Sequence, residues 1–410
     1  MSDNEEKFLP GPKAAEFLGV KPATLYAYAS RGLIESIPTD NGRERCYRLS
    51  DLISLRQCSR GFKSTKDPTT AVWTGPVIKS AITDIRDDGH CYRGKSAIEL
   101  ALSDTPFELV AELLWETPEG AHTAWAKVKP LPAPASLKEL AQADTDYLDL
   151  LKLLLVTIEM SDPVSRKLLS ADVFDTARRL IVAMALTPGL AGSQMSYLAE
   201  ARFPIAQSLL ATLSGNKSAE KARLINRALV LCADHELNAS ALAARIAASC
   251  DASLYSCLLS ALGTFSGSLH GSACRRAEDI VSNSLKFKNA RAWLKDYLRH
   301  LERIPGFGGD LYEQGDPRAR VLIAASEAVS TRNVHLRRLI EIVECVRDEL
   351  GVQPNLDVGL AAISYALSLP PGSGSTIFAV SRTAGWIAHA IEQRQYGGVI
   401  RPRARYIGRV

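Results

Sequence analysis

The stretch "HLRRLIEIVECVRDELG" at residues 335–351 decides the fold class. Its apolar positions follow the i, i+3, i+4, i+7 spacing of an amphipathic helix, and they are Leu336, Leu339, Ile340, Val343, Val346 and Leu350. Gly351 and Pro354 then predict the end of the helix. The same periodicity runs through 148–160, 172–186, 221–233, 240–262 and 384–394, and alternating strand patterns are almost absent after residue 70. The body of the chain is therefore predicted to be all-α.

Length and composition indicate a globular protein of two or three domains, since 46% of the 410 residues are hydrophobic. No apolar run reaches the roughly 18 residues of a bilayer span, and "MSDNEEKFLP" at the start is unlike a signal sequence. We therefore expect a cytoplasmic protein with no membrane partner. The eight cysteines have no CxxC spacing, which predicts neither a metal site nor a disulfide framework. A net charge of +4 is too small for a surface coated by nucleic acid, so any basic function must be local.

The first 60 residues form a different kind of unit. "GPKAAEFLGVKPATLYAYASRGLI" (11–34) predicts two short helices separated by a turn at Gly19, with the second helix ending at Gly32. "ESIPTDNGRERCYRLSDLISL" (35–55) predicts a hairpin with Asn41-Gly42 at its tip, followed by a closing helix. Over residues 8–60 this arrangement resembles the winged helix-turn-helix of the MerR family.

That resemblance implies that the second helix enters the major groove of DNA and that the hairpin contacts phosphates. The residues in these roles are Thr24, Tyr26, Tyr28 and Arg31 on the helix, and Arg43 and Arg45 on the hairpin. From Lys21 to Lys66 nine Lys and Arg face four Asp and Glu, a balance of +5. However, Lys21 stands where Ser or Thr would cap the second helix, and small helical modules often dock on a neighbouring domain. DNA binding and docking both remain open.

The stretch "ERIPGFGGDLYEQGDPRA" (302–319) predicts a glycine-rich loop that leads into a helix. Gly306, Gly308 and Gly309 allow backbone conformations that other residues resist, and they let a ligand approach the main chain closely. Glycine-rich loops are also ordinary connectors, so the loop by itself does not separate a binding role from a linking role.

Six ordered motifs together carry a second resemblance. They are "ADHELNASALAARIAAS" (233–249), "GTFSGSLHGSACRRA" (263–277), the glycine-rich loop (302–319), "PNLDVGL" (354–360), "IFAVSRTAGWIAHAIEQ" (377–393) and "IRPRARYIG" (400–408). With the upstream "CYRGKSAIEL" (91–100), the set closely resembles the citrate synthase family over residues 72–408.

The resemblance implies a Claisen-type condensation, in which the deprotonated methyl group of acetyl-CoA attacks the ketone of oxaloacetate. Such chemistry needs a carboxylate base and a donor that stabilises the enolate oxygen. The family pattern assigns Asp357 as the base, His270 as the neutral donor, and His235 as a residue that holds the oxo acid. Asp357 after "PNL" also fits a helix cap. The remaining histidines, which are His90, His122, His300, His335 and His389, are predicted to be surface or packing residues, and their spacing suggests no metal.

A dicarboxylate substrate needs cations, and the planar fork of arginine suits a carboxylate. The family motifs place Arg318, Arg382 and Arg401 around the oxo acid. In the family the last of these reaches the neighbouring subunit's site, which implies a homodimer with shared active sites. Coenzyme A would lie along the backbone of Ile304, Pro305, Gly306, Phe307 and Gly308, and Arg303 could meet its phosphates.

The chain departs from the family at the centre of the loop. The family has a second histidine where this chain has Gly309, and Pro or Arg where it has Asp310. Loss of one donor lowers rates by roughly 10²–10³, and an added carboxylate repels a dianion. We therefore expect Gly309 to reduce the activity.

The predicted architecture is a MerR-like helix-turn-helix domain (1–66), a large citrate synthase-like helical domain (67–270 and 366–410) and a small one (271–365). The predicted activity is citrate synthase-type acyl transfer to a 2-oxo acid in the tricarboxylic acid cycle, with a coenzyme A thioester as co-substrate and no permanently bound cofactor. Two alternatives stay open. One is a weakened homologue that binds coenzyme A or an oxo acid and is the sensing part of a DNA-binding regulator. The other is a partner that assembles with an active synthase.

Overall fold

A computed structural model describes residues 8–18, 20–30, 34–39, 45–49, 51–52, 78–129, 131, 135–142, 144–161, 172–191, 204–300, 304–308, 311–312, 314–330, 332–402, 406 and 408. Several predicted features lie outside these residues. They are Gly19, Arg31, Gly32, the Asn41-Gly42 tip, Arg43, Arg303, Gly309, Asp310 and the polar stretch 61–70, which the sequence predicts to be an interdomain linker.

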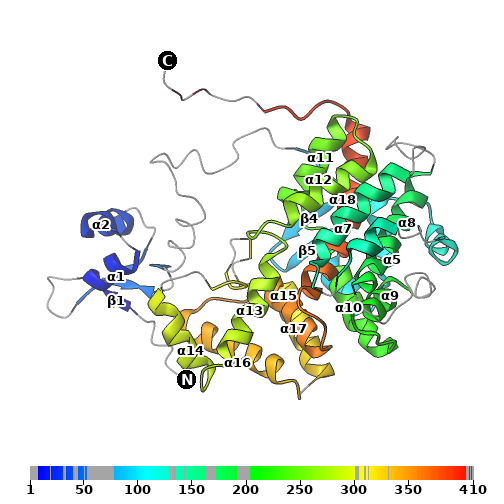
Figure 1. The fold of residues 1–410 in the computed structure, drawn as a ribbon. Helices are drawn as coiled ribbons and strands as arrows, with labels where there is room; N and C mark the ends of the chain where they lie inside the picture. Colours follow the sequence, from blue (N-terminus) through cyan, green and yellow to red (C-terminus); the bar gives the residue numbers. More distant parts are fainter. Residues whose placement is uncertain are drawn as a thin grey trace.

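The N-terminal unit contains two short helices and a small sheet, and Figure 1 draws it in blue beside the helical body. Its elements are β1 (Phe8–Pro10), α1 (Gly11–Leu18), α2 (Pro22–Ser30), β2 (Ser36–Pro38) and β3 (Arg45–Arg48). The strands pair antiparallel in the order β1-β3-β2, so the predicted hairpin is confirmed. Seven residues form its core: Ala14, Ala15, Leu18, Leu25, Ile34, Tyr47 and Leu52. Phe17 and Leu49 also pack against the core of the body.

The body begins with a small antiparallel sheet that the sequence analysis did not predict. It consists of β4 (Thr83–Arg86), β5 (Gly89–Tyr92) and β6 (Lys95–Ser96), in that order. The prediction of an all-α body is therefore wrong in this detail. These strands are only two to four residues long, and all four residues of β5 are buried, so no alternating pattern marks them.

The rest of the described body is helical. Its α-helices are α4 (Ala97–Leu102), α5 (Phe107–Trp115), α6 (Ala135–Leu140), α7 (Tyr147–Ser161), α8 (Val173–Leu186), α9 (Ile205–Ser214), α10 (Ala219–Cys232), α11 (Ala239–Ser249), α12 (Leu254–Phe265), α13 (Ala273–Ser284), α14 (Ala290–Tyr297), α15 (Pro317–Val329), α16 (Val334–Leu350), α17 (Leu356–Ala366) and α18 (Ser373–Tyr396). Short 3-10 turns are η2 (Ala121–Lys127), η4 (Thr187–Leu190) and η5 (Leu298–His300).

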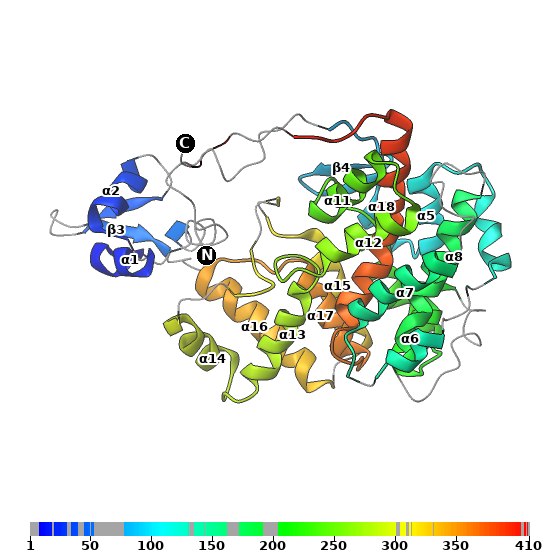
Figure 2. The same ribbon diagram turned by 45° about the horizontal axis from the view of Figure 1, so that its top comes forward.

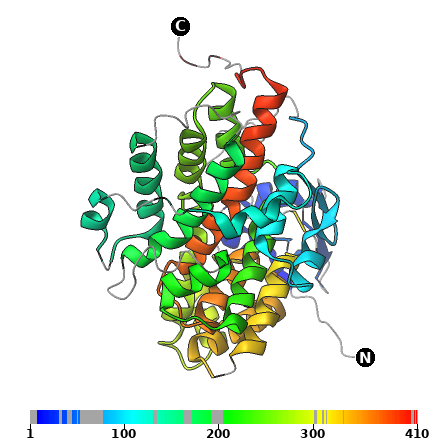
Figure 3. The same cartoon turned by 90° about the vertical axis from the view of Figure 1, so that its right-hand side faces the viewer.

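Helix α18 is the centre of the body. Every residue from Ser373 to Gln393 is buried, and the helix packs against α5, α7, α8, α10, α11, α12, α13 and α17. Figures 1 and 2 show it among these helices, and Figure 3 shows it in red along the length of the body. The periodicity at 384–394 marked only its second half, because a helix that is buried all round has no polar face to reveal its period.

Two other helical predictions have different outcomes. The helix around 335–350 is confirmed, and Gly351 ends it with a φ of 69°. The single segment predicted at 240–262 is wrong, since it contains two helices, α11 and α12. The break includes Asp251, whose φ of 64° is left-handed, and Ser253, whose side chain caps α12.

Helices α13 to α17 lie together at one end of the body, drawn yellow-green to orange in Figures 1 and 2. Within it α15 packs on α17, α14 on α16, and α13 on both α16 and α17. Among the described residues no helix is long and apolar enough to cross a membrane.

Candidate active site

The predicted site residues gather where this helical group meets the rest of the body. His235 follows α10, His270 lies between α12 and α13, Arg318 is in the first turn of α15, Asp357 is in the first turn of α17, and Arg382 is in the middle of α18. Segments up to about 150 residues apart are thereby joined, as when Arg382 Nε donates to the carbonyl of Cys232 at 2.7 Å.

His270 is held by a serine. Its Nε2 lies 2.9 Å from Ser240 Oγ, and this hydroxyl also accepts from Trp386 Nε1 at 3.0 Å and lies 2.7 Å from Asn238 Oδ1. The imidazole packs beside Phe265, with 5.1 Å between ring centroids. Burial and then Arg382 lower the pKa of His270 to about 4, so the ring is neutral at neutral pH.

The residue after this histidine must be glycine. A Cβ at Gly271 would lie 2.1 Å from the ring of Phe265, and the Gly271 N–H donates to the carbonyl of Phe265 at 2.9 Å. The close approach seats the "LHG" turn against the end of α12. It therefore fixes the position from which His270 projects.

His235 faces a tyrosine from the glycine-rich loop. Its Nε2 lies 2.8 Å from Tyr312 Oη, and both side chains are buried. Burial lowers the pKa of His235 well below its usual value, and the electrostatic effects of Arg318, His90 and Arg382 act in the same direction. His235 is therefore neutral at neutral pH.

Arg318 forms a bidentate ion pair with the residue that caps its own helix. Its Nε lies 2.9 Å from Asp316 Oδ1, and its Nη2 lies 2.7 Å from Asp316 Oδ2. Burial opposes the charge of each group, but the pair outweighs it, so the pKa of Arg318 is raised and that of Asp316 is lowered. Asp316 thus fixes a buried cation at the site.

Arg382 is the second buried cation. Besides its bond to Cys232, its guanidinium carbon lies 4.9 Å from the ring centre of Phe378, one helical turn earlier in α18. Burial lowers the pKa of Arg382, and the negative charge of Asp234 partly offsets that effect. The two arginines lower the pKa values of both His90 and His235, although Asp316 is paired with Arg318, so they oppose a positive charge on these histidines.

Asp357 is attached to the glycine-rich loop through the backbone. Asn355 caps α17 by accepting from the Asp357 N–H at 3.0 Å. The Asn355 N–H donates to the Gly306 carbonyl at 2.8 Å, and the Gly308 N–H donates to Gln353 O at 2.8 Å. Gly306 has a φ of +83°, and a Cβ there would lie 2.6 Å from Val358. The predicted coenzyme A segment therefore packs directly against the turn that carries the predicted base.

Two of the remaining histidines are packing residues, which is one of the two roles predicted for them. His90 and His389 are almost fully buried, and His90 lies beside His235 with 5.1 Å between ring centroids. Burial, with Arg318 and Arg382, lowers the pKa of His90 to about 3. No pattern in the sequence indicates that His90 belongs to the site, because its contact with His235 spans 145 positions of the chain. Tyr312 was missed as well, although it belongs to the quoted loop.

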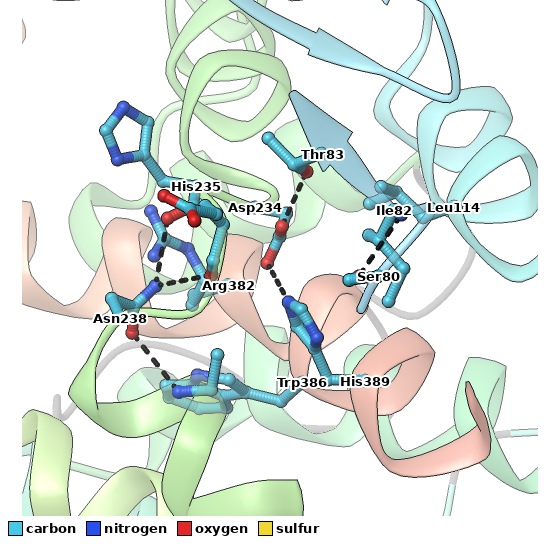
Figure 4. A network of polar contacts seen from close by, with 12 residues as sticks. Ser80, Ile82, Thr83, Leu114, Asp234, His235, Asn238, Arg382, Trp386 and His389 are labelled. Atoms are coloured by element: carbon cyan, nitrogen blue, oxygen red, sulfur yellow. Dashed lines mark hydrogen bonds and ion pairs between the residues drawn. The ribbon is translucent and has the colours of Figure 1, made fainter. Parts of the chain in front are cut away.

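A buried polar network lies behind Arg382 (Figure 4). Asp234 accepts from Thr83 Oγ1 at 2.6 Å and lies 3.3 Å from His389 Nε2, and Arg245 Nε donates to His389 Nδ1 at 2.9 Å. Arg245 also pairs with Glu392. Since Asp234 directly precedes His235, this network fixes the end of α10 relative to α18.

The remaining predicted residues lie elsewhere. Arg401 is exposed beyond the end of α18. In the N-terminal unit Tyr26 is exposed, Thr24 and Tyr28 are half-buried, and Arg45 bonds through Nε to Ser36 Oγ at 2.9 Å. Of the other histidines His122 is exposed and His335 is half-buried. Within the described part of the chain, no three metal-binding side chains come together.

Comparison with known proteins places most of the chain in one family. The family model described as "Citrate synthase, C-terminal domain" matches residues 71–403. A citrate synthase of Haloferax volcanii is 40% identical over 211 residues, which is 50% of this chain and 55% of the relative. The 2-methylcitrate synthase 1 of Corynebacterium glutamicum is 31% identical over 215 residues, covering 50% and 56%. The chain thus spans about half the length of the curated relatives it matches.

Solved structures show the same fold. Citrate synthase of Thermoplasma acidophilum, solved with carboxymethyl coenzyme A and oxaloacetate, has a TM-score of 0.72 and 22% sequence identity. The similarity covers 84% of this chain and 97% of that one. Citrate synthase of Thermotoga maritima has a TM-score of 0.69 and 24% identity, covering 82% and 94%.

Proposed function

Because this chain belongs to the citrate synthase family, we propose that it condenses an acyl-CoA with a 2-oxo acid and releases coenzyme A. Acetyl-CoA and oxaloacetate are the first substrates to test. The observation that carries the proposal is the convergence of two neutral histidines and two buried arginines, with one carboxylate on the turn that is bonded to segment 304–308. Asp357, His270, His235, Arg318 and Arg382 together supply a base, a donor and an anion site.

In this mechanism Asp357 removes a proton from the methyl group of the thioester. The carbonyl oxygen gains negative charge as the proton leaves, so a neutral donor beside it stabilises the enolate. The single proton of the Ser240 hydroxyl has two acceptors within reach, Asn238 Oδ1 at 2.7 Å and Nε2 of His270 at 2.9 Å. The mechanism requires the form in which this hydroxyl donates to Nε2 of His270. His270 then keeps its own proton on Nδ1 and offers it to the thioester oxygen.

The oxo acid is held by cations and by His235. Arg318 and Arg382 are buried, so each of their interactions with a carboxylate is stronger than it would be in water. The resulting enol attacks the ketone carbon, a new carbon–carbon bond forms, and hydrolysis of the thioester releases coenzyme A. Segment 304–308 supports the thioester, because its backbone is bonded to the turn that carries Asp357.

We also infer a large domain of residues 67–270 and 366–410 and a small domain of residues 271–365 that closes over the substrates. The packing of α13 to α17 on one another supports this division, and α13, α15 and α17 join the group to α10 and α18. Small-angle scattering with and without an oxo acid and a coenzyme A analogue tests closure, and the same profile in both conditions would contradict it.

A homodimer with shared sites is the assembly that these surfaces favour. Helices α7 and α11 both pack on α12, and they expose Val156, Met160 and Ile246. Tyr396 and Val399 are exposed near the base of the C-terminal segment that carries Arg401. Exposed apolar side chains on these segments support an interface between subunits. Light scattering tests the dimer, and Arg401→Ala should lower oxo-acid affinity if the site is shared.

For the N-terminal unit we infer a MerR-like helix-turn-helix layout with a docking role, because Phe17 and Leu49 pack against the core of the body. DNA binding through Thr24, Tyr26, Arg31, Arg43 and Arg45 is the competing role. Deleting residues 1–66 should leave a folded body that melts at a lower temperature, as loss of a docked module requires. Salt-sensitive binding to DNA that is weakened by Arg45→Ala would instead support DNA contact.

The direct test of the proposed activity is a thiol-release assay. The purified chain is offered acetyl-CoA or propionyl-CoA with a panel of 2-oxo acids. Release of coenzyme A should require both substrates and should be abolished by Asp357→Asn. Release that is independent of the oxo acid would mean simple thioester hydrolysis, and no release with any pair would favour a sensing or partner role.

A further inference from the structure

Tyr312 and His235 are joined by a bond between distant segments. The phenol oxygen lies 2.8 Å from His235 Nε2, and the ring centroids are 5.8 Å apart. Tyr312 comes from the loop before α15, whereas His235 follows α10, so 77 positions of chain separate them. Both side chains are at most 8% exposed, which removes the competition of water for this bond.

Both partners keep their neutral forms near neutral pH. Burial raises the pKa of Tyr312 to about 12, against the lowering effect of Arg318. The pKa of His235 lies well below its usual value, as described above. The pair therefore carries one O–H proton and one N–H proton. Only one of them lies between Oη and Nε2, so the other is available on the far side, either on the phenol or on Nδ1.

The charged groups around the pair determine which kind of ligand atom accepts this second proton. Arg318 and Arg382 are close enough to lower the pKa of His235. Although Arg318 is paired with Asp316, both arginines still oppose a positive charge beside His235. A group that accepts a hydrogen bond here is therefore an oxygen flanked by negative charge. The carbonyl of a 2-oxo acid has this character, whereas the ammonium of a 2-amino acid would be repelled.

His90 packs against the ring of His235. The Tyr92 hydroxyl donates to the Val230 carbonyl at 2.8 Å, so it accepts from His90 Nε2, which lies 2.9 Å away. Among the described residues Nδ1 of His90 has no hydrogen-bond partner. His90 therefore does not compete for the proton of the Tyr312–His235 pair and gives it a neutral neighbour.

We propose that Tyr312 and His235 act as one hydrogen-bond donor to the carbonyl oxygen of the oxo acid, with Tyr312 as the positioning residue that sets which atom of the pair carries the free proton. The proposal rests on the proposed function, because it takes a 2-oxo acid as the ligand. It adds a specificity-determining residue that the predicted site did not contain.

The test compares Tyr312→Phe with Tyr365→Phe in the full-length chain. Tyr365 is a matched control because its hydroxyl donates to a backbone carbonyl, Glu278 O, at 2.8 Å. Oxaloacetate affinity is measured by calorimetry, and kcat and KM are measured by thiol release. Tyr312→Phe should weaken oxaloacetate binding and kcat/KM by about 10- to 100-fold, the worth of one hydrogen bond to a charged or polarised ligand, with the KM for acetyl-CoA unchanged. Tyr365→Phe should change the oxaloacetate affinity and kcat/KM by no more than about twofold, because its hydroxyl bonds to a backbone carbonyl and not to a site residue.

A double-variant cycle tests whether the two residues act as a unit. His235→Gln combined with Tyr312→Phe should bind oxaloacetate no more weakly than the worse single variant, whereas independent groups would give additive losses. Selective ¹⁵N labelling of histidine in the wild type supplies a readout that needs no variant to fold. The Nδ1 and Nε2 signals of His235 should shift on addition of oxaloacetate.

The results of these experiments distinguish a failure of the proposed donor pair from a failure of the proposed enzymatic function. Oxaloacetate binding that depends on Tyr312 without release of coenzyme A would overturn the enzymatic function and support the donor pair. Turnover that is unaffected by Tyr312→Phe would overturn the donor pair and keep the enzyme. Additive losses in the cycle, or unchanged His235 signals, would also overturn the pair.

Discussion

Ser240 provides the sharpest test of how His270 is positioned. Its hydroxyl is the shared partner of His270 Nε2 at 2.9 Å and Trp386 Nε1 at 3.0 Å, and both Ser240 and Trp386 are fully buried. Ser240→Ala removes this partner without adding volume. The indole N–H then has no acceptor at that position, which should cost about 1–3 kcal/mol of unfolding free energy.

The same substitution should slow the reaction. Without the hydroxyl, nothing at Nε2 favours the form of His270 that carries its proton on Nδ1. Complete loss of a donor at a developing oxyanion costs roughly 10²–10³ in kcat, and here the donor remains but is no longer oriented. We therefore expect a smaller loss than that, of about 10- to 100-fold in kcat. The KM for the oxo acid should change little.

Ser326→Ala is the matched control. Ser326 is also fully buried, and its hydroxyl donates only along its own helix, to Leu322 O at 2.7 Å. Thiol release under saturating substrates gives kcat for both variants, and thermal melting gives their stability. If Ser240→Ala keeps the kcat of the wild type and only its melting temperature falls, the prediction is wrong. Ser240 would then bond to Trp386 without orienting His270.

Three further predictions follow from the charges of the site. Arg382→Leu should raise the KM for oxaloacetate by about 10- to 150-fold by removing a charge-assisted hydrogen bond, and an unchanged KM in steady-state kinetics would exclude Arg382 from substrate binding. Gly309→His with Asp310→Pro should raise turnover with oxaloacetate by about 10- to 1000-fold, the worth of one added donor, whereas no gain would mean that the Tyr312–His235 pair already polarises the ketone fully. His90 has a folded pKa of about 3, below its unfolded value, so the unfolded state binds more protons as pH falls below about 6.5 and stability is lost. From pH 7 to pH 5 this costs about 2 kcal/mol, so the melting temperature of His90→Leu should fall less over that interval than that of the wild type.

The sequence predicted what local patterns can carry. Helix α16 and its end at Gly351 follow from apolar spacing and a glycine cap, and the positions of His270, Asp357, Arg318 and Arg382 follow from motifs. Periodicity could not reveal the first half of α18, because a helix buried on every side shows no alternation of polar and apolar faces.

The contacts between distant segments were out of reach of such patterns. His90 lies in a four-residue strand, and only the folded chain brings it against His235. Tyr312 is one residue of a polar loop, and nothing in the loop indicates that its hydroxyl meets an imidazole 77 positions away. The pairing of Arg318 with Asp316 was readable in principle, since a capping aspartate two residues before an arginine brings the two side chains together.

The central claim is that Asp357 takes a proton from the acyl methyl group and that a new carbon–carbon bond forms. Mass spectrometry of the products from trideuterated acetyl-CoA and oxaloacetate measures this directly. We expect the wild type to form a condensed acid that retains two of the three deuterium atoms. Asp357→Asn should form no condensed acid. Trideuterated acetate as the sole product would contradict the account, because it would show hydrolysis of the thioester without condensation.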